Sequence, residues 1–198
     1  MIAIEPGRTA LCVMDFQNDI VAMLGDAAAP VVERTAGLIA AARAAQIPIF
    51  YVVVGFRPGY PEANARNERF AAIARTGRFQ LTAPPGSDVV PALRPEHGDI
   101  IVIKHRVSAF AGTDLDMILR AKGIDTLVLS GISTSGVVLS TTRHAADADH
   151  RLVIVKDCCA DPDDEVHRVL TEKVLARQAV VVVASEAAAA FSGAAAGA

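Results

Sequence analysis

The chain has 198 residues, of which 52% are hydrophobic, and a formal net charge of −3 at pH 7. That length and apolar content predict one domain, over 1–198, with a sizeable core. The slightly acidic balance, without a basic stripe, argues against a nucleic-acid partner. The sequence shows no run of about 18 uncharged apolar residues and no signal-peptide pattern, so we expect a cytoplasmic protein with no membrane partner.

The chain has three cysteines, and two of them, Cys158 and Cys159, are adjacent. An odd number with this spacing is not a disulfide framework and is typical of a reducing compartment. No Cys/His spacing resembles a zinc site. We therefore expect neither a disulfide framework nor a zinc site.

Short apolar runs rich in branched residues predict six strands buried on both faces. These runs span 9–14, 48–54, 100–103, 126–129, 151–155 and 180–183. Apolar residues at helical spacing predict helices between them, over 31–45, 114–122, about 137–149 and about 162–176. Strands that alternate with helices predict a three-layer α/β/α sandwich with a six-stranded parallel sheet and right-handed crossovers.

Two stretches fall outside this alternation. Residues 55–99 hold several prolines and glycines and one short helix-like piece near 67–75. A segment of this length without strong periodicity indicates a lid or binding loop, although a solvated surface excursion is the simpler alternative. The Ala-rich end predicts a helical turn that gives way to a disordered tail at about 187–198.

Polar residues stand at the ends of three predicted strands. Asp15 follows the first, Lys104 follows the third, and a turn from Gly131 to Val137 follows the fourth. Because ligands bind at the carboxyl ends of strands in open parallel sheets, we expect these groups to meet there. An Asp and a Lys in an apolar crevice perturb each other's pKa, and such a carboxylate can move protons. Singly, each is more typical of a turn former or a solvated strand end.

Two stretches, TALCVMDFQNDI and IVIKHRVSAFAGTDLDMILRAKGIDTLVLSGISTSGVV, together with the strand order between them, resemble the isochorismatase-like hydrolases, or cysteine hydrolase superfamily. The resemblance covers about 9–183 and implies the sheet order 3-2-1-4-5-6. It implies a catalytic Asp15 and Lys104, and a nucleophilic cysteine at the position that Val137 occupies here. It also implies a cis peptide between Ile132 and Ser133, with the backbone N–H groups of Ser133 and Val137 as oxyanion donors.

Valine has no nucleophilic group, so the family's usual thiol route is closed at position 137. The resemblance includes isochorismatases, which also lack the cysteine and hydrolyse a vinyl ether with the Asp as acid and water as nucleophile. We therefore expect a small-molecule hydrolase with Asp15, Lys104 and an activated water, acting on an amide, carbamoyl or enol-ether substrate. The alternatives are a non-catalytic binding or scaffold homologue, and a thiol enzyme that uses Cys158 or Cys159.

The resemblance and the strand ends also suggest which residues surround the substrate. The candidates are Phe16, Gln17, Arg57, Ser108, Phe110 and Thr134. Arg57 would clamp a substrate carboxylate, although a solvated loop arginine is the simpler interpretation. The sequence after the second strand lacks the Asp-x-His pattern with which nicotinamidases hold a metal, so we expect no metal and no cofactor. The family resemblance implies a homodimer or homotetramer.

Overall fold

The computed structural model describes residues 4–81 and 88–195. Its strands form one parallel sheet in the order β3-β2-β1-β4-β5-β6, as the family resemblance implied. The strands are β1 (Thr9–Met14), β2 (Ile49–Val54), β3 (Ile100–Lys104), β4 (Thr126–Ile132), β5 (Arg151–Ala160) and β6 (Val180–Val182).

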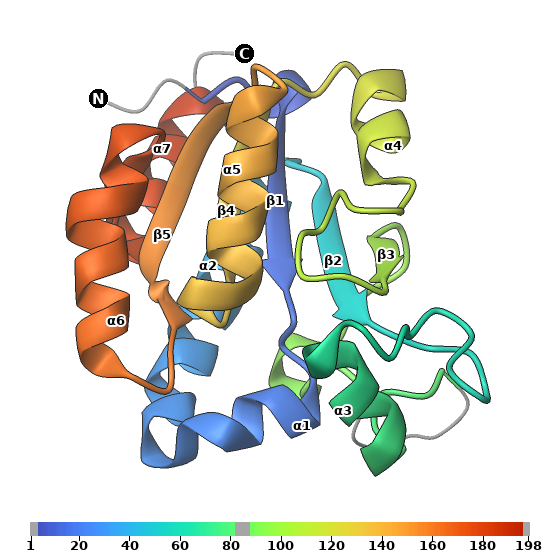
Figure 1. Ribbon diagram of the computed structural model, residues 1–198. Helices are drawn as coiled ribbons and strands as arrows, with labels where there is room; N and C mark the ends of the chain where they lie inside the picture. Colours follow the sequence, from blue (N-terminus) through green and yellow to red (C-terminus); the bar gives the residue numbers. More distant parts are fainter. Residues whose placement is uncertain (1–3, 82–87, 196–198) are drawn as a thin grey trace.

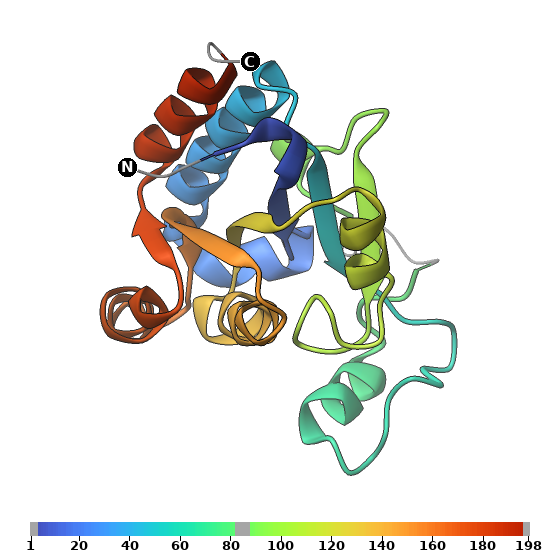
Figure 2. The same ribbon diagram turned by 90° about the horizontal axis from the view of Figure 1, so that it is seen from above.

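Helices lie on both faces of this sheet (Figures 1 and 2). Helices α2 (Ala28–Ala44) and α7 (Ala184–Ala195) cover one face. Helices α4 (Leu115–Ala121), α5 (Leu139–Asp147) and α6 (Asp164–Val169) lie on the other. The remaining helices are α1 (Asn18–Val21) and α3 (Glu68–Thr76). The predicted three-layer sandwich is therefore confirmed.

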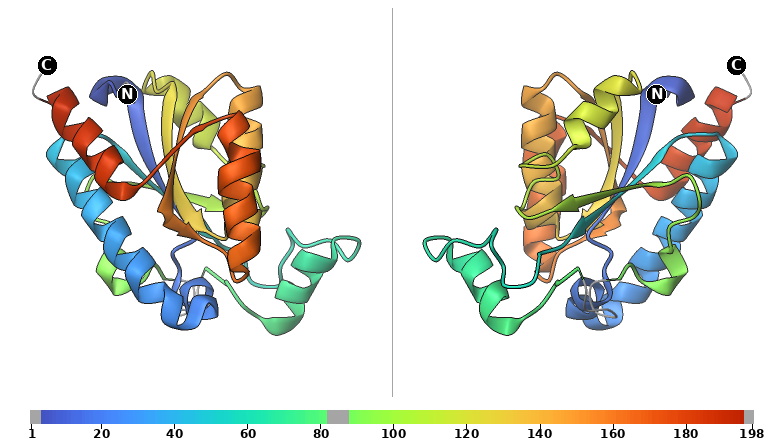
Figure 3. Two further views of the ribbon diagram at one scale, coloured as in Figure 1. Left: turned by 90° about the vertical axis from the view of Figure 1, so that its left-hand side faces the viewer. Right: turned by 90° about the vertical axis from the view of Figure 1, so that its right-hand side faces the viewer.

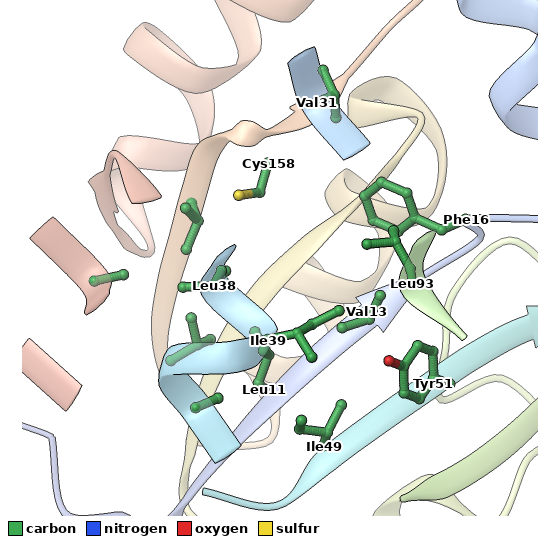
Figure 4. Packing of buried hydrophobic residues seen from close by; sticks show 14 of the residues in the cluster. Leu11, Val13, Phe16, Val31, Leu38, Ile39, Ile49, Tyr51, Leu93 and Cys158 are labelled. Atoms are coloured by element: carbon green, nitrogen blue, oxygen red, sulfur yellow. The ribbon is translucent and has the colours of Figure 1, made fainter. Parts of the chain in front are cut away.

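The packing of β1 explains why its sequence is apolar from Ala10 to Met14. Leu11 and Val13 pack toward α2, and Ala10, Cys12 and Met14 pack toward the opposite layer. Successive side chains alternate between faces, so a strand covered on both sides needs apolar residues at every position. Figure 4 shows the α2 side of this core, where Leu11 and Val13 meet side chains of α2.

The strand β5 runs to Ala160, five residues beyond the predicted end. A register shift between Leu129 and Gly131 of β4 lets Gly131 pair with Cys159 and Ile132 with Ala160. The half-buried Lys156 and Asp157 interrupt the apolar run, which is why the sequence pattern suggested an earlier end. Both Cys158 and Cys159 thus lie within β5, near its carboxyl end, and not in a loop after it.

The predicted disordered tail is wrong for 187–195, while 196–198 lie outside the described residues. Helix α7 continues to Ala195 and packs along α2 (Figures 2 and 3). Ala187 and Phe191 are buried against the β-sheet core, with exposed fractions of 1% and 0%. Burial of the Phe191 ring thus orders α7, a segment whose composition alone suggested disorder.

The segment 55–99 begins with an arm that carries α3 away from the sheet, as the two side views in Figure 3 show. The arm has its own small apolar cluster, in which Phe56, Tyr60, Phe70 and Phe79 pack beside Val54. It is therefore a folded excursion and not a solvated loop over the described residues. None of the described helices is long and apolar enough to cross a bilayer.

Candidate active site

Asp15 and Lys104 meet at the carboxyl ends of β1 and β3, on either side of β2. The Lys104 Nζ lies 3.0 Å from Asp15 Oδ2, and the two side chains are only 3% and 7% exposed. The same ammonium donates a hydrogen bond to the backbone oxygen of Arg106, at 3.1 Å. The sequence placed both residues at strand ends, and the parallel sheet brings them into contact.

The environment of Asp15 leaves one of its carboxylate oxygens without a hydrogen-bond partner among the described residues. Its backbone has a positive φ of 61°, a conformation that aspartate tolerates better than most residues. The Oδ1 atom is buried and has no hydrogen-bond partner among the described residues. Burial raises the pKa of Asp15, and the positive charges of Lys104 and Arg69 oppose that rise. One oxygen of this buried carboxylate therefore has no hydrogen-bond partner among the described residues, while the other faces Lys104.

The turn after β4 forms the third side of the site. The peptide between Ile132 and Ser133 is cis, as the resemblance implied, and a π-helical turn follows over Thr134–Val138. At Gly131, an added Cβ would lie 2.9 Å from the Met14 backbone oxygen, so the close approach of β4 to β1 requires glycine.

Helix α6 and the loop before it hold this turn from behind. The Thr134 Oγ1 lies 2.8 Å from His167 Nδ1, and the Ser135 backbone N–H donates to Asp161 Oδ2 at 2.7 Å. Burial lowers the pKa of His167, with the charges of Asp161 and Asp164 acting in the opposite direction. Two successive residues of the turn are therefore anchored by side chains from outside it.

The Asp15–Lys104 pair and the turn enclose a cavity of about 180 Å³. Val137, at the position where the resemblance implies a nucleophile, lines this cavity and is 2% exposed. The other lining residues come from the end of β2, the segment after β3, the turn, the α1 region and the α3 arm: Ile20, Met23, Val54, Arg69, Phe70, Ile73, Arg78, Phe79, Arg106, Val107, Ile132 and Ser133.

The model of the isochorismatase domain matches residues 9–187 of this chain. The chain belongs to the isochorismatase family. It is 35% identical over 188 residues to the ureidoacrylate amidohydrolase RutB of Methylobacterium radiotolerans, covering 84% of this chain and 73% of the relative.

Two solved structures of the family share the fold. A cysteine hydrolase from Pseudomonas syringae pv. phaseolicola 1448A superposes with a TM-score of 0.90 at 25% identity, covering 98% of this chain and 97% of the other. The N-carbamoylsarcosine amidase from Thermoplasma acidophilum superposes with a TM-score of 0.74 at 31% identity, covering 89% and 96%. The named relatives of this isochorismatase-family chain are thus hydrolases.

Six residues were predicted to bind substrate, and none of them lines the cavity. Phe16 packs in the core on the α2 side of the sheet. The Gln17 side chain is buried and bonds both the N–H and the C=O of Val54, at 2.7 and 2.9 Å. Arg57 pairs with Glu62 at 2.5 Å and is exposed on the arm. Each of these side chains therefore has a structural partner of its own.

The other three candidates lie close behind the site. Ser108 accepts a hydrogen bond from the Phe110 backbone N–H at 3.2 Å. The Phe110 ring stacks on His144, with centroids 4.7 Å apart. Thr134 is fully buried and faces His167. Direct contact of these three with substrate stays a prediction, and their observed contacts support the walls and the turn.

Three arginines that sequence analysis missed line the cavity: Arg69, Arg78 and Arg106. The Arg78 Nε lies 3.2 Å from Asp19 Oδ2, and Arg106 lies over the Phe70 ring, 5.3 Å from its centroid. Arg69 has no hydrogen bond or ion pair within the described part of the chain. For Arg69 and Arg78, the available signal was that residues 55–99 contain arginines and no lysine, a pattern that favours recognition of a planar anion.

The three cysteine thiols lie outside the cavity. Cys12, Cys158 and Cys159 are buried within strands and do not line the cavity. Burial raises the pKa of Cys12 and of Cys158 to about 12 and raises that of Cys159 as well. Burial therefore disfavours a thiolate at each position and argues against a displaced nucleophile at Cys158 or Cys159. Over the residues described, we find no group of three or more His, Cys, Asp or Glu suited to a metal ion.

Proposed function

We propose that this protein hydrolyses a small amide or carbamoyl compound with Asp15, Lys104 and a water molecule, without a covalent thiol intermediate. The observation that carries this proposal is the free, buried Oδ1 of Asp15 inside a cavity that Val137 also lines. Water placed between that oxygen and Val137 would stand where the family resemblance implies a thiol.

The proposed reaction follows from the geometry of the two charged residues. Oδ1 of ionised Asp15 takes a proton from water as the water oxygen bonds to the carbonyl carbon. The carbonyl oxygen becomes an oxyanion, which the backbone N–H groups of Ser133 and Val137 would stabilise. Asp15 then passes the proton to the leaving nitrogen as the carbon–nitrogen bond breaks. Lys104 stays charged beside Oδ2 and orients the carboxylate.

The substrate class that we favour is a carbamoyl compound with a carboxylate. The arginines at 69, 78 and 106 give the cavity a positive wall, and guanidinium groups bind carboxylates in a bidentate manner. The relatives named for ureidoacrylate and N-carbamoylsarcosine point to the same chemistry. An enol ether is the second substrate class, because the raised pKa of Asp15 also suits it as a proton donor to carbon.

The alternative is a homologue that binds a small molecule and has lost catalysis. Val137 favours it, since the position carries no reactive group. The retained pair of Asp15 and Lys104 argues against it, because an unneeded buried ion pair costs desolvation energy. We also propose that the protein acts in the cytoplasm as a homodimer or homotetramer, without metal or cofactor.

The test is turnover by purified protein, followed by mass spectrometry, against ureidoacrylate, N-carbamoylsarcosine, simple amides and isochorismate. We expect hydrolysis of a carbamoyl acid, loss of it in Asp15→Asn, and retention in the surface control Asp116→Asn. A Cys158→Ala/Cys159→Ala variant should keep its activity. Turnover that survives Asp15→Asn would contradict the mechanism, and saturable binding without turnover would favour the non-catalytic alternative.

A further inference from the structure

A second, larger hollow lies at the β3 edge of the sheet, on the face that α2 covers elsewhere. It has a volume of about 680 Å³. We call it the edge groove and define it by Val53, Leu81, Asp88, Arg94, Ile101 and Ile103. Tyr51 pairs with Ile101 and Val53 with Ile103 in the sheet register, so these side chains share one face.

The edge groove leaves large apolar side chains in solvent. Ile101 is 54% exposed, Leu81 45% and Ile103 39%, whereas Val102 on the opposite face of the same strand is fully buried. β3 is also one of the two edge strands of the sheet. Isolated edges are usually protected by charged residues or proline, yet 100–103 of this edge is apolar. Such a contiguous apolar patch is typical of an interaction surface.

Opposite charges stand at the two ends of the edge groove. Asp88 lies at the carboxyl end of the strands, where its backbone oxygen accepts a hydrogen bond from the Asn18 N–H at 2.9 Å. Arg94 lies toward the amino end, where it lines a neighbouring hollow with Tyr51 and Ile39. Both are exposed, and within 4–81 and 88–195 neither side chain has an ion pair. A surface with an acid at one end and a base at the other is complementary to itself when turned by 180°.

We infer that the edge groove is the dimer interface, occupied by a second copy of this chain related by a two-fold axis. The axis passes between Ile101 and Ile103, so the two apolar strand faces meet antiparallel. Arg94 of one copy then faces the partner's Asp88, and the reverse pair forms by symmetry. This inference makes the proposed homo-oligomer specific. It is independent of the hydrolase proposal, because Ile101, Asp88 and Arg94 do not line the Asp15 cavity.

Sedimentation velocity over a range of protein concentrations tests the apolar centre of the interface. We expect the wild type to dimerise and Ile101→Arg to raise the dimer Kd by at least about tenfold, because it buries an unpaired charge between two copies. The matched control is Met117→Arg on α4, where the native side chain is 63% exposed and lies outside the edge groove. It should leave the dimer Kd unchanged.

Charge reversal tests the orientation with substitutions at exposed positions that do not threaten folding. Arg94→Asp and Asp88→Arg should each weaken the dimer. The double variant, and an equimolar mixture of the two single variants, should restore it, because either combination recreates opposite charges across the axis. A wild type that stays monomeric would overturn the inference, and so would a dimer that is indifferent to Ile101→Arg or a double variant that is not restored. Turnover of monomeric variants reports separately on the proposed function.

Discussion

The central residues of the site form a buried ion pair whose energetics depend on both partners. Asp15 and Lys104 have nearly no contact with solvent, and each compensates the desolvation of the other at 3.0 Å. The uncompensated part is Oδ1 of Asp15, which has no partner among the described residues. We therefore expect this pair to reduce the stability of the fold while it holds the carboxylate that we propose to be catalytic.

The first prediction concerns the stability of variants at these two positions. Asp15→Asn or Lys104→Met alone should lower the free energy of unfolding by about 3–5 kcal/mol, because each leaves one buried group without its counter-charge. The double variant Asp15→Asn/Lys104→Met should be as stable as the wild type or more stable by about 1–4 kcal/mol. Urea denaturation at pH 7 measures these differences.

The same variants carry a pH dependence. Folding raises the pKa of Asp15, so the folded state holds the proton more tightly than the unfolded chain does. The stability contributed by this group is full below about pH 4, the ordinary range for an unfolded Asp, and is lost as pH rises through the folded pKa. The advantage of the double variant over the wild type should therefore grow from pH 4.5 toward neutral pH. A difference that is flat across this range would contradict the raised pKa.

At the scale of elements, the turn after β4 depends on α6 for its position. The Thr134 hydroxyl meets Nδ1 of His167, and the Ser135 N–H meets Asp161. Because Ser133 and Val137 of this turn face the cavity, the pair of contacts connects α6 to the proposed oxyanion donors. His167 is a positioning residue in this arrangement, since its own ring does not line the cavity.

The second prediction follows from the burial of His167. Burial lowers its pKa below the unfolded value of about 6.5, so stability from this residue is present above that pH and is lost as pH falls. Relative to a His167→Gln variant, the wild type should lose up to about 1.4 kcal/mol per pH unit between pH 6.5 and the folded pKa. Thermal unfolding between pH 5 and 8 measures this. The exposed His97→Gln control should track the wild type, and an equal slope in His167→Gln would contradict the prediction.

Helices and strands could be predicted from the sequence where the pattern of apolar residues matches the pattern of buried positions. The strand over Thr9–Met14 matches its prediction residue for residue, because it is apolar from Ala10 to Met14 and buried on both faces. β5 and α7 were predicted too short, because Lys156 and Asp157 interrupt one pattern and alanines with small polar residues obscure the other. Phe191 is the residue that orders α7, and its partners on α2 are far away in the sequence.

In the candidate site, too, some residues could be predicted from the sequence and others could not. Asp15, Lys104 and the turn at Gly131 could be placed because parallel strands end at one edge of the sheet. The residues that form the cavity walls could not be predicted. Arg69, Phe70 and Arg78 reach the cavity only because the arm packs on Val54 and Phe56. No local pattern in 55–99 records that packing.

At the scale of the whole molecule, the charge around the cavity is opposite in sign to the net charge of the chain. The chain carries a net charge of −3, yet the cavity is bordered by Arg69, Arg78 and Arg106 in addition to Lys104. Asp15 is the single acidic residue among the described residues that line it. A concave site with one dominant sign of charge concentrates ligands of the opposite sign, even on a protein of opposite net charge. This distribution of charge supports the proposed carboxylate-bearing substrate.

The third prediction concerns this local field. Arg69→Gln should raise KM for a carboxylate-bearing substrate such as N-carbamoylsarcosine by about tenfold, because a guanidinium–carboxylate hydrogen bond contributes roughly 1.5–3 kcal/mol. The value of kcat should change less, since Arg69 is exposed on α3 and does not contact the Asp15–Lys104 pair through a hydrogen bond. Arg75→Gln on the same helix is the matched control, because Arg75 does not line the cavity.

The same local field predicts a dependence on salt. Raising ionic strength from 0.02 to 0.5 M shortens the Debye length from roughly 20 Å to about 4 Å. This change should lower kcat/KM of the wild type for the anion but not for a neutral amide. Steady-state kinetics on both substrates measure these effects, and a neutral amide that responds equally to Arg69→Gln would show that the arginine supports the wall of the cavity and does not bind the anion.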